Sequence, residues 1–439
     1  MSTSHGGPTF HHGVHPPENK HWTSGLSIER MPFVDELTLP LSQHIGAPAK
    51  AIVTVGQDVK RGEQIAAPGG FVSTSHHAPV TGRVVAIEPR LHPNGKMMQS
   101  IVIRTDPYSS QRLPEDPNAN GDLTDAVKRV QQAGLVGLGG AAFPSHVKLS
   151  VPDGKHVDTI VINGCECEPF LTCDHRIMVE RPEAVVRGTE ILVELAGASR
   201  GVIGVELNKP DAIAALKSVS STVVEIKGVQ VKYPQGAEKM LIQSIFGKQV
   251  PAGGLPLDLH MVVNNVGTAA SLADFFDRGL PLVERVVTVT GAGIARPRNL
   301  MVPLGTPVSA VLEYCGGLTD GARQVILGGP MMGMSQKSLE IPTLKGTSGI
   351  LCLDQPAIAD HQEYPCIRCG RCLEACPMFL NPARLARMAR NDRAELLEEN
   401  NLMHCFECAS CSFVCPSRIP LVQWMRMGKA MVRAAKAAK

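Results

Sequence analysis

The 439-residue sequence lacks the features that would place it at once among membrane, exported or nucleic-acid-binding proteins. Neither sign of charge dominates, since 43 lysines and arginines face 41 acidic residues, so the total charge gives no reason to expect nucleic-acid binding. No apolar run approaches the roughly 18 residues that predict a transmembrane helix. The polar, histidine-rich stretch 1–20 also lacks the apolar core of a signal peptide. We therefore expect a cytoplasmic protein, free or docked on a partner.

The first part of the chain is expected to form an arm and a small β domain. Residues 1–33 carry five histidines among glycines and prolines, which favours a solvated arm over a metal site. From 34 to 105, apolar and polar residues alternate between glycine turns, a pattern that predicts short strands. The pattern resembles the β barrel-sandwich of lipoyl and biotinyl domains, although the hairpin at Ser75-His76-His77 has no lysine to carry a modification. Residues 106–121 are expected to form a linker.

The middle of the chain changes to alternating strands and helices. Between residues 122 and 280 we expect an α/β domain, with buried strands over 157–162, 202–206 and 260–263 and helices over 123–133 and 210–219. Residues 281–350 predict a smaller β-grasp-like module, with strands over 286–290 and 324–327 and a helix over 307–314. The fold class expected for the chain is therefore a multidomain α/β protein.

Cysteine is unevenly distributed, since eight of the 13 cysteines lie in two runs of identical spacing near the C-terminus. Each run is Cys-x-x-Cys-x-x-Cys-x-x-x-Cys-Pro, the pattern of two-cluster bacterial ferredoxins. The first three ligands curl around one [4Fe–4S] cubane, and the fourth, followed by proline, reaches the other. We therefore predict one cluster on Cys366, Cys369, Cys372 and Cys415, and another on Cys405, Cys408, Cys411 and Cys376. Zinc on paired Cys-x-x-Cys units is the alternative, which the repeated third and fourth cysteines disfavour.

The cysteine runs lie in a segment, residues 360–420, that is expected to form an α-helical ferredoxin domain with a helix over 383–397. Basic residues interleaved with apolar ones over 421–439 predict a final amphipathic helix. Such a helix either contacts an acidic partner or a membrane surface, or packs on the ferredoxin domain.

A glycine-rich loop in the α/β region predicts a phosphate site. Gly137, Gly139 and Gly140 let backbone N–H groups approach a phosphate, and Phe143-Pro144 leads into a helix whose N-terminus favours an anion. Lys148 follows within reach of the same anion. Polar groups also follow two predicted strands, in Asn163-Gly-Cys-Glu-Cys-Glu-Pro and in Asn264-Asn265, at the strand ends where α/β domains bind ligands.

Together these motifs resemble the FMN- and NADH-binding subunit of respiratory complex I, which has a glycine loop ending in Phe-Pro, an Asn-x-x-Glu-x-Glu-Pro strand end and a Val-Asn-Asn-Val strand end. The resemblance implies that FMN is held by Gly137, Gly139, Gly140, Lys148, Asn163, Glu166, Glu238, Asn264 and Asn265. It also implies that Phe143 stacks near the nicotinamide or adenine and that Glu168 contacts the nicotinamide nucleotide. Two positions depart from that family, since Leu138 replaces a basic residue and Cys165 replaces an aspartate.

With the barrel and the two cysteine runs added, nearly the whole chain resembles RnfC, a component of the Rnf complexes, the ion-translocating ferredoxin:NAD+ oxidoreductases. The shared segments include residues 13–20, 233–239 and 328–333. The resemblance implies electron exchange between NAD(H), FMN and two [4Fe–4S] clusters, in a peripheral subunit on the cytoplasmic face of the bacterial inner membrane. The implied partners are a ferredoxin-like subunit and integral membrane subunits that move Na+ or H+.

Two other functions remain open. A soluble flavin and iron–sulfur cobalamin reductase of bacterial microcompartments shares much of the motif set. A scaffold that has lost its flavin and carries electrons through clusters alone is allowed by Leu138 and Cys165. Cys165, Cys167 and Cys173 are candidate ligands of a third metal, although the loop offers no clear fourth ligand.

Overall fold

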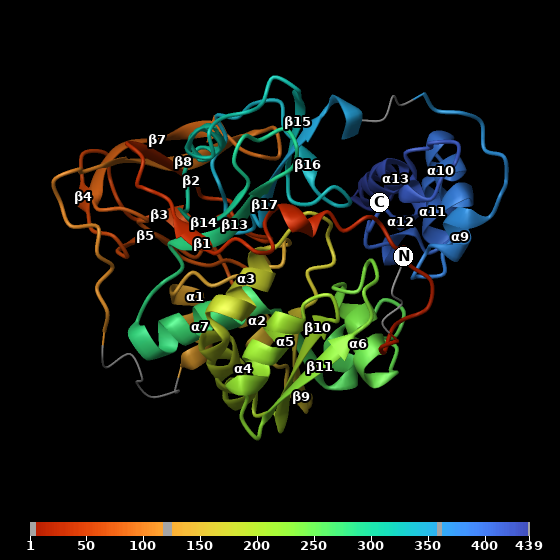
Figure 1. The fold of residues 1–439 in the computed structure, drawn as a ribbon, viewed down its shortest axis with the longest axis horizontal. Coiled ribbons are helices and arrows are strands. Elements are labelled where there is room, and N and C mark those ends of the chain that lie inside the picture. The colour runs from red at the N-terminus through yellow and green to blue at the C-terminus, as the bar shows by residue number, and fades with distance from the viewer. Residues whose placement is uncertain (1–5, 117–124, 358–361, 438–439) are drawn as a thin grey trace.

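The computed structural model describes residues 6–116, 125–357 and 362–437 of the chain. It contains two small β units, a larger α/β unit and a helical C-terminal unit (Figure 1). The predicted strands of the α/β unit lie within two residues of their expected bounds. None of the described helices is both long and apolar enough to cross a membrane.

The barrel-sandwich domain packs two antiparallel sheets over one apolar core. The larger sheet joins β2 (Glu36–Pro40), β8 (Met97–Thr105), β7 (Gly82–Leu91) and β4 (Asp58–Val59). The smaller joins β3 (Lys50–Ala51), β5 (Gln64–Ala67) and β6 (His76–His77). Because side chains alternate along a strand, Leu37, Leu39, Ile101 and Ile103 all point inward and are fully buried.

The α/β domain has a four-stranded parallel sheet in the order β11 (Val224–Val229), β10 (Arg200–Glu206), β9 (Thr159–Gly164) and β12 (Met261–Asn265). Its helices are α1 (Ala126–Gln132), α2 (Ser145–Leu149), α3 (Cys173–Glu180), α4 (Pro182–Ala196), α5 (Pro210–Ser218), α6 (Glu238–Phe246) and α7 (Val266–Arg278), with a 3-10 turn η2 (Pro256–Leu259). Helix α1 accounts for the described part of the helix expected over 123–133, whose first two residues lie outside the described residues. Parallel pairing brings all four strand ends to one edge.

A six-stranded mixed sheet forms the next unit, in the order β1 (Ile28–Arg30), β14 (Arg298–Pro303), β13 (Glu284–Thr290), β17 (Gly349–Asp354), β15 (Ala322–Leu327) and β16 (Met334–Ser335). Helix α8 (Val308–Tyr314) packs on this sheet. Strand β1 comes from the N-terminal arm and runs parallel to β14.

The solvated arm expected over 1–33 is therefore wrong for its described part. Phe10, Val14 and Lys20 are buried, and η1 (Lys20–Trp22) and β1 pack against other domains. The physical reason is that the arm finds partners far along the chain, and no local pattern in the arm records them.

The C-terminal domain is helical, with α9 (Arg371–Glu374), α10 (Pro382–Arg390), α11 (Ala394–Glu399), η4 (Leu402–His404), α12 (Ser410–Phe413) and α13 (Leu421–Ala437), after a turn η3 (Gln355–Ala357). The single helix expected over 383–397 is wrong, because Asp392 adopts a left-handed conformation (φ 52°) and separates α10 from α11. Helix α13 packs on α10 and α11 and buries Leu421, Met425 and Val432. This packing supports the packed alternative for the basic tail.

Candidate functional site

Strands β9 and β12 place two asparagines side by side at the ligand edge of the sheet, because Asn163 pairs with Asn265 in register. The Asn163 amide donates from Nδ2 to the Gly236 carbonyl (2.8 Å) and accepts from the Cys165 N–H at Oδ1 (3.0 Å). Asn265 caps α7 by accepting from the Gly267 N–H (2.8 Å) and donates to Asp174 (2.6 Å). Both amides therefore fix the backbone around the site.

Asn264 differs from its two neighbours. Its side chain is 5% exposed, and its Nδ2 has no hydrogen-bond partner among the described residues. Next to it, Lys148 Nζ donates to the Val263 carbonyl (2.8 Å) and to Glu238 (2.8 Å). Buried polar atoms almost always find a partner, so a free donor beside a lysine is the arrangement expected where a polar ligand binds.

The glycine loop lies over the start of α7. The Leu138 N–H donates to Thr268 Oγ1 (2.9 Å), and the Gly137 N–H donates to the Phe143 carbonyl (2.8 Å). A Cβ at Gly139 would lie 3.5 Å from the Asn265 side chain, while Gly140 (φ 118°) is exposed with open space around it. The loop thus carries exposed backbone beside Asn265, Phe143 is half-buried, and Leu138 is buried in the domain core.

The two acids after β9 are bonded to the protein itself. The Glu166 carboxylate accepts the N–H groups of Asp174 (2.8 Å) and His175 (3.1 Å), at the start of α3. The Glu168 carboxylate accepts the N–H groups of Met332 (2.9 Å) and Met331 (3.1 Å), in the loop between β15 and β16. Burial raises the pKa of Glu168 to about 7. The structure thus places the Glu168 carboxylate against a loop of the neighbouring domain.

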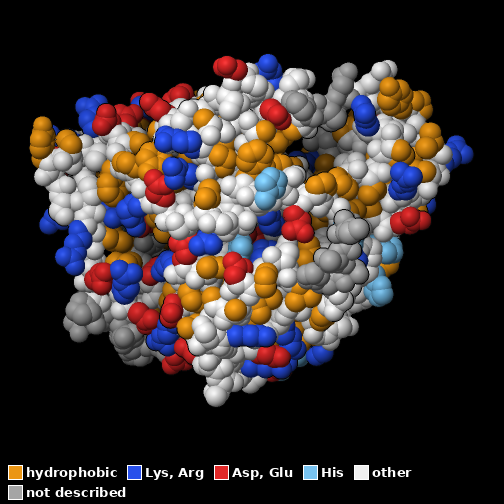
Figure 2. Space-filling model, in the orientation of Figure 1, with side chains coloured by type: hydrophobic (Ala, Val, Ile, Leu, Met, Phe, Trp, Pro, Cys, Tyr) orange, Lys and Arg blue, Asp and Glu red, His pale blue; other side chains and the backbone are white. Residues whose placement is uncertain are grey.

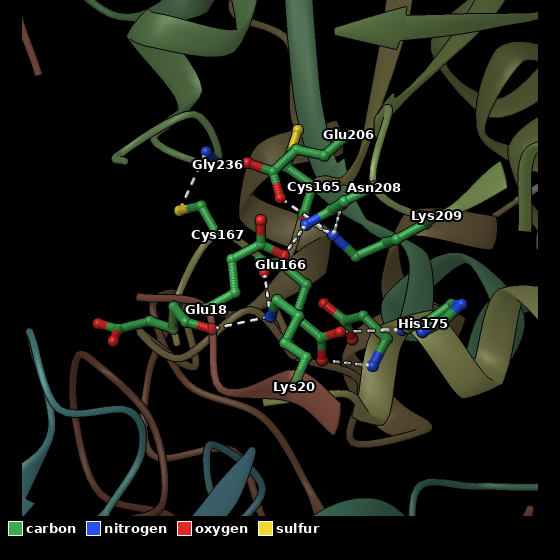
Figure 3. Close-up of polar contacts among 12 residues, drawn as sticks. Glu18, Lys20, Cys165, Glu166, Cys167, His175, Glu206, Asn208, Lys209 and Gly236 are labelled. Carbon is green, nitrogen blue, oxygen red and sulfur yellow. Dashed lines mark hydrogen bonds and ion pairs between the residues drawn. The ribbon is translucent and has the colours of Figure 1, made fainter. Parts of the chain in front are cut away.

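Sequence reasoning assigned no role to Lys20, which holds the same loop. Its ammonium donates to the carbonyls of Leu171 (2.6 Å), Glu166 (2.8 Å) and Glu168 (2.9 Å), and burial lowers its pKa (Figure 3). Tyr233, 1% exposed, was also missed as a site residue. Both residues belong to sequence motifs that resemble the Rnf family, which was the available signal.

The three cysteines of this region have separate partners. Cys165 faces the Gly204 carbonyl (3.7 Å), Cys167 accepts the Gly236 N–H (3.3 Å), and Cys173 lies near Asp174 (4.0 Å). Burial raises the pKa of all three thiols. Glu166, Cys173 and Asp174 are the side chains that gather as candidate metal ligands in the described residues, and both Glu166 oxygens are already occupied by backbone N–H groups.

The cysteines of the helical domain divide into two sets. One cavity is lined by Cys376, Cys405, Cys408 and Cys411, with Leu380, Leu385 and Met425 around them. Burial raises the pKa of these four thiols, and a metal reverses this effect because it binds the thiolate. In the other set, Cys366 and Cys369 are exposed. Burial raises the pKa of Cys372, and charge repulsion from the nearby Cys415 raises it further.

The two regions meet at one small apolar cluster. Tyr233 forms it with Val14 of the arm and Ala375 of the helical domain, and Cys167 and Cys408 pack against it. The loop of the α/β domain that contains Tyr233 therefore lies next to Cys408, one of the four cysteines that line the cavity.

Four family models match consecutive parts of the chain. They are the RnfC barrel sandwich hybrid domain over 8–108, the Nuo51 FMN-binding domain over 130–274, the SLBB domain over 286–335 and the 4Fe-4S dicluster domain over 363–419.

Curated relatives match nearly the whole chain. The RnfC protein of the proton-translocating ferredoxin:NAD(+) oxidoreductase complex of Clostridium ljungdahlii is 43% identical, over 97% of this chain and 94% of that protein. Its counterpart in the Na(+)-translocating complex of Acetobacterium woodii is 42% identical over 98% of both chains. The chain belongs to the RnfC family. The corresponding RnfC protein of the ion-translocating oxidoreductase complex of Rhodobacter capsulatus is 40% identical, over 95% of this chain and 82% of that protein. Among solved structures, a chain of NAD+-reducing [NiFe]-hydrogenase in the H2-reduced state has a TM-score of 0.49 and 19% identity, over 72% of this chain and 61% of that one.

For an RnfC protein, the residues present fit both cofactor types. The FMN-binding model spans the glycine loop, the β9 end and the Asn264-Asn265 pair. The unpartnered Asn264 amide, the Lys148 ammonium and the open backbone at Gly140 offer donors of the kind a flavin phosphate and ring accept. The thiol-lined cavity offers the four sulfur ligands that a [4Fe–4S] cluster takes.

Proposed function

We propose that this chain exchanges hydride with NAD(H) at an FMN in the α/β domain, and exchanges single electrons between that FMN and two [4Fe–4S] clusters. The observation that carries the proposal is the cluster of Tyr233, Val14 and Ala375, which brings the flavin-side Cys167 and the cluster-side Cys408 into one contact region. When bound, FMN supplies the conversion between two-electron hydride chemistry and one-electron cluster chemistry. Such a relay requires its two sites to adjoin.

The FMN-holding residues divide by chemistry. Gly139 and Gly140 supply backbone N–H groups for the phosphate, with the Lys148 charge balanced by Glu238. Gly137 shapes the loop, because its N–H donates to the Phe143 carbonyl. The Asn264 amide donor, which has no partner among the described residues, is available to bind the flavin. Asn163, Asn265 and Glu166 act on the flavin chiefly by fixing the strand ends and the start of α3, since their polar atoms are bonded to protein groups.

The nicotinamide side is proposed to involve Phe143 and Glu168 in different ways. Phe143 follows the exposed part of the glycine loop, where a ring can stack on a base. Glu168 holds the backbone of Met331 and Met332, so we propose that it acts on the nucleotide by positioning this loop at the rim of the site.

The two clusters are proposed to act in a fixed order. The cluster on Cys376, Cys405, Cys408 and Cys411 is proximal to the flavin, because Cys408 packs against the apolar cluster that contains Tyr233. The cluster on Cys366, Cys369, Cys372 and Cys415 is distal, because Cys366 and Cys369 are exposed. Crossed ligation by Cys376 and Cys415 ties the two cluster loops together and fixes the distance between them.

The distal end offers a docking face for an acidic electron-transfer partner. Ile367 (69% exposed) and Leu373 (38% exposed) lie among Arg368 and Arg371 beside the exposed cysteines. Hydrophobic and basic side chains also lie next to one another over this end of the molecule (Figure 2). Charge of this sign attracts an acidic surface and steers the encounter. A ferredoxin-like subunit is the partner that this face fits.

In the whole complex we propose a peripheral subunit on the cytoplasmic face of the bacterial inner membrane, held there by membrane-spanning partner subunits that move Na+ or H+. Support comes from the relatives' names, which specify ion translocation, and from the absence of a membrane-crossing helix among the described residues.

Cofactor analysis with anaerobic NADH titration of the purified chain tests the proposal. We expect one FMN and about eight iron atoms per chain. NADH should bleach the flavin and cluster absorbance together. Full iron with no FMN and no NADH–ferricyanide activity would establish the flavin-free scaffold. Co-purification with a corrinoid enzyme instead of membrane subunits would favour the cobalamin reductase.

A further inference from the structure

The N-terminal arm contains a motif, Gly13-Val-His-Pro-Pro-Glu-Asn-Lys20, that the proposed electron route does not use. The start of this motif lies against the ferredoxin domain. The Gly13 N–H donates to the Ala375 carbonyl (3.2 Å), and His12 Nδ1 lies 3.0 Å from the carbonyl oxygen of the cluster ligand Cys376. The His12 ring also packs on Phe379, with centroids 4.4 Å apart.

The same segment is bonded to the α/β domain on its other side. Val14 and Tyr233 exchange two backbone hydrogen bonds (2.8 and 2.9 Å), as a short antiparallel bridge. Upstream, Lys232 donates to the Phe10 carbonyl (2.9 Å) and its ammonium lies 4.7 Å from the Phe10 ring centroid. Adjacent residues of the arm thus contact the proximal cluster loop and the flavin-side loop.

Lys20 anchors the end of the motif. Its ammonium, on a side chain that is 9% exposed, is shared among the three carbonyls of the loop that follows β9 (Figure 3). The same part of the arm makes a further contact with this loop, because the Glu18 backbone carbonyl accepts the Phe170 N–H (2.8 Å). A buried ammonium is tolerated only where its donors are satisfied, so this anchor depends on the arm following this path.

The arm supplies the polar contacts of this junction. Between the described residues of the ferredoxin domain and the described rest of the chain, the hydrogen bonds come from His12 and Gly13. The cluster of buried apolar residues that joins these described parts is the small one around Tyr233, which also includes Val14 of the arm. In Figure 1 the described N-terminal segment starts beside the α/β domain near α6, passes the ferredoxin domain and then runs on toward β1.

Gly13 is the point at which the arm passes between the two domains. Its φ of 83° is a conformation that residues with a side chain rarely adopt. A Cβ there would lie 2.6 Å from the Tyr233 carbonyl and 2.9 Å from the Phe10 ring. No side chain fits without displacing the arm from one of the domains.

We propose that residues 8–20 form a clasp that holds the ferredoxin domain against the α/β domain, at the distance that electron transfer from the proposed FMN requires. His12, Gly13, Val14 and Lys20 are positioning residues, since they act through Cys376, Tyr233 and the 166–171 loop. The inference rests on the proposed function for its electron-transfer consequence. Tunnelling falls steeply with distance, so a loosened clasp slows flavin-to-cluster transfer while the flavin site itself stays intact.

The test uses Gly13→Val in the full chain, with Gly25→Val as the matched control, because a Cβ at Gly25 meets nothing within 4 Å and its φ lies outside the left-handed region. We expect Gly13→Val to keep its FMN, its iron and the rate at which NADH reduces the flavin. Stopped-flow bleaching of the clusters should slow by about tenfold or more, the size expected of small misplacements far from the reacting groups. Gly25→Val should behave as wild type.

Amide hydrogen exchange gives a readout that needs no cofactor turnover. In Gly13→Val, peptides covering 8–20 and 371–380 should exchange faster, while the barrel peptides keep their wild-type rates. Unchanged exchange in both peptides, or faster exchange with wild-type cluster bleaching, would overturn the clasp. If wild-type flavin is not reduced by NADH, the proposed function fails, and the exchange result still decides whether the arm joins the domains.

Should Gly13→Val fail to retain its cofactors, His12→Ala gives the same test with a smaller change. It removes the contact with Cys376 and the packing on Phe379. His15→Ala, at an exposed position of the same arm, is its control. We expect slower cluster bleaching and faster exchange over 371–380 in His12→Ala alone, and equal behaviour of the two variants would reject the clasp.

Discussion

The α/β domain contacts its neighbours in contrasting ways on its two sides. On the side of the two β units, buried charged groups connect all three domains: Lys345 donates to the Ser75 carbonyl of the barrel hairpin (2.7 Å) and to the Gly134 carbonyl of the α/β domain (2.8 Å). On the side of the ferredoxin domain, hydrogen bonds between described residues come from the N-terminal arm and the apolar contact is small. The first junction is a shared buried core, whereas the second is a small interface held by the N-terminal arm.

The contrast matches what each junction has to do. The barrel hairpin at Ser75-His76-His77 is buried against its neighbours, so it serves as a fixed structural contact. The ferredoxin domain must face the flavin on one side and an external partner on the other. Domains joined by a small interface are expected to move relative to one another, and the proposed clasp restricts that motion at one point.

The largest effect should come from breaking the relay beyond the small junction. Cys408→Ala removes a ligand of the proximal cluster, and Cys369→Ala removes one of the distal cluster. Each variant should lose about four iron atoms. Cys408→Ala should also abolish bleaching of the remaining cluster by NADH, whereas Cys369→Ala should leave proximal bleaching at the wild-type rate. Iron analysis and stopped-flow absorbance measure both quantities.

The order of the clusters would be contradicted by the reverse pattern, in which Cys369→Ala stops all NADH-driven bleaching and Cys408→Ala spares it. Cys315→Ala, a buried cysteine of the β-grasp-like unit, is the control and should keep full iron. Flavin reduction should be unaffected in all three variants, because none of the substitutions lies in the flavin site.

An intermediate effect is expected at the shared-core junction. Lys345→Met leaves the Ser75 and Gly134 carbonyls without their buried donor and should cost about 1–3 kcal/mol of unfolding free energy. Burial lowers the pKa of Lys345 to about 7. Between pH 7 and the unfolded value near 10.5 the unfolded chain binds the extra proton, so this group adds stability as pH rises.

Chemical denaturation at pH 7 and pH 9 checks this sign. The stability gap between wild type and Lys345→Met should widen at pH 9, because the variant lacks the titrating group. Lys337→Met, at an exposed position of the same β-grasp-like unit, should show no such change. A gap that is equal at both pH values would show that Lys345 does not titrate in this window.

Local signals explain what the sequence could predict. Apolar runs predicted the parallel strands because a fully buried strand is encoded by a short continuous run of apolar residues. The spacing of the cysteines predicted which four would meet, and Cys376 does lie with Cys405, Cys408 and Cys411 around one cavity. The break between α10 and α11 also had a local signal, since Asn391-Asp392 is a polar pair that tolerates a left-handed residue, but helical periodicity on both sides outweighed it.

The features that escaped prediction depend on partners far along the chain. His12 meets Cys376 across 364 residues, and Lys20 meets Glu166 across 146. Nothing in the arm's composition distinguishes such contacts from solvation. Glu168 shows the same limit, because its carboxylate is bound by the backbone of Met331 and Met332, whose N–H groups carry no side-chain signature. Candidate site residues could be named from motifs, but their hydrogen bonds required the tertiary fold.

The smallest effect is expected at the distal end of the ferredoxin domain, where the side chains around Cys366 and Cys369 face solvent. Ile367→Glu adds an acidic group directly before Arg368 in the sequence, which should weaken encounter with an acidic partner. With dithionite-reduced acidic ferredoxin as donor, the second-order rate of cluster reduction should fall by about 3 to 10 times at low salt, since rim charges act mainly on association rates.

A control substitution at a distant position and a series of salt concentrations separate this local effect from that of a changed net charge. Met97→Glu, at an exposed site on the barrel (60% exposed), adds the same charge far from the clusters and should leave the rate unchanged. The difference between the two variants should shrink as salt rises, because exposed charges are screened over about 10 Å at 0.1 M ionic strength. Equal rates for Ile367→Glu and Met97→Glu at low salt would move the partner's docking face away from Cys366 and Cys369. The small junction and the docking face would then no longer lie at opposite ends of one relay.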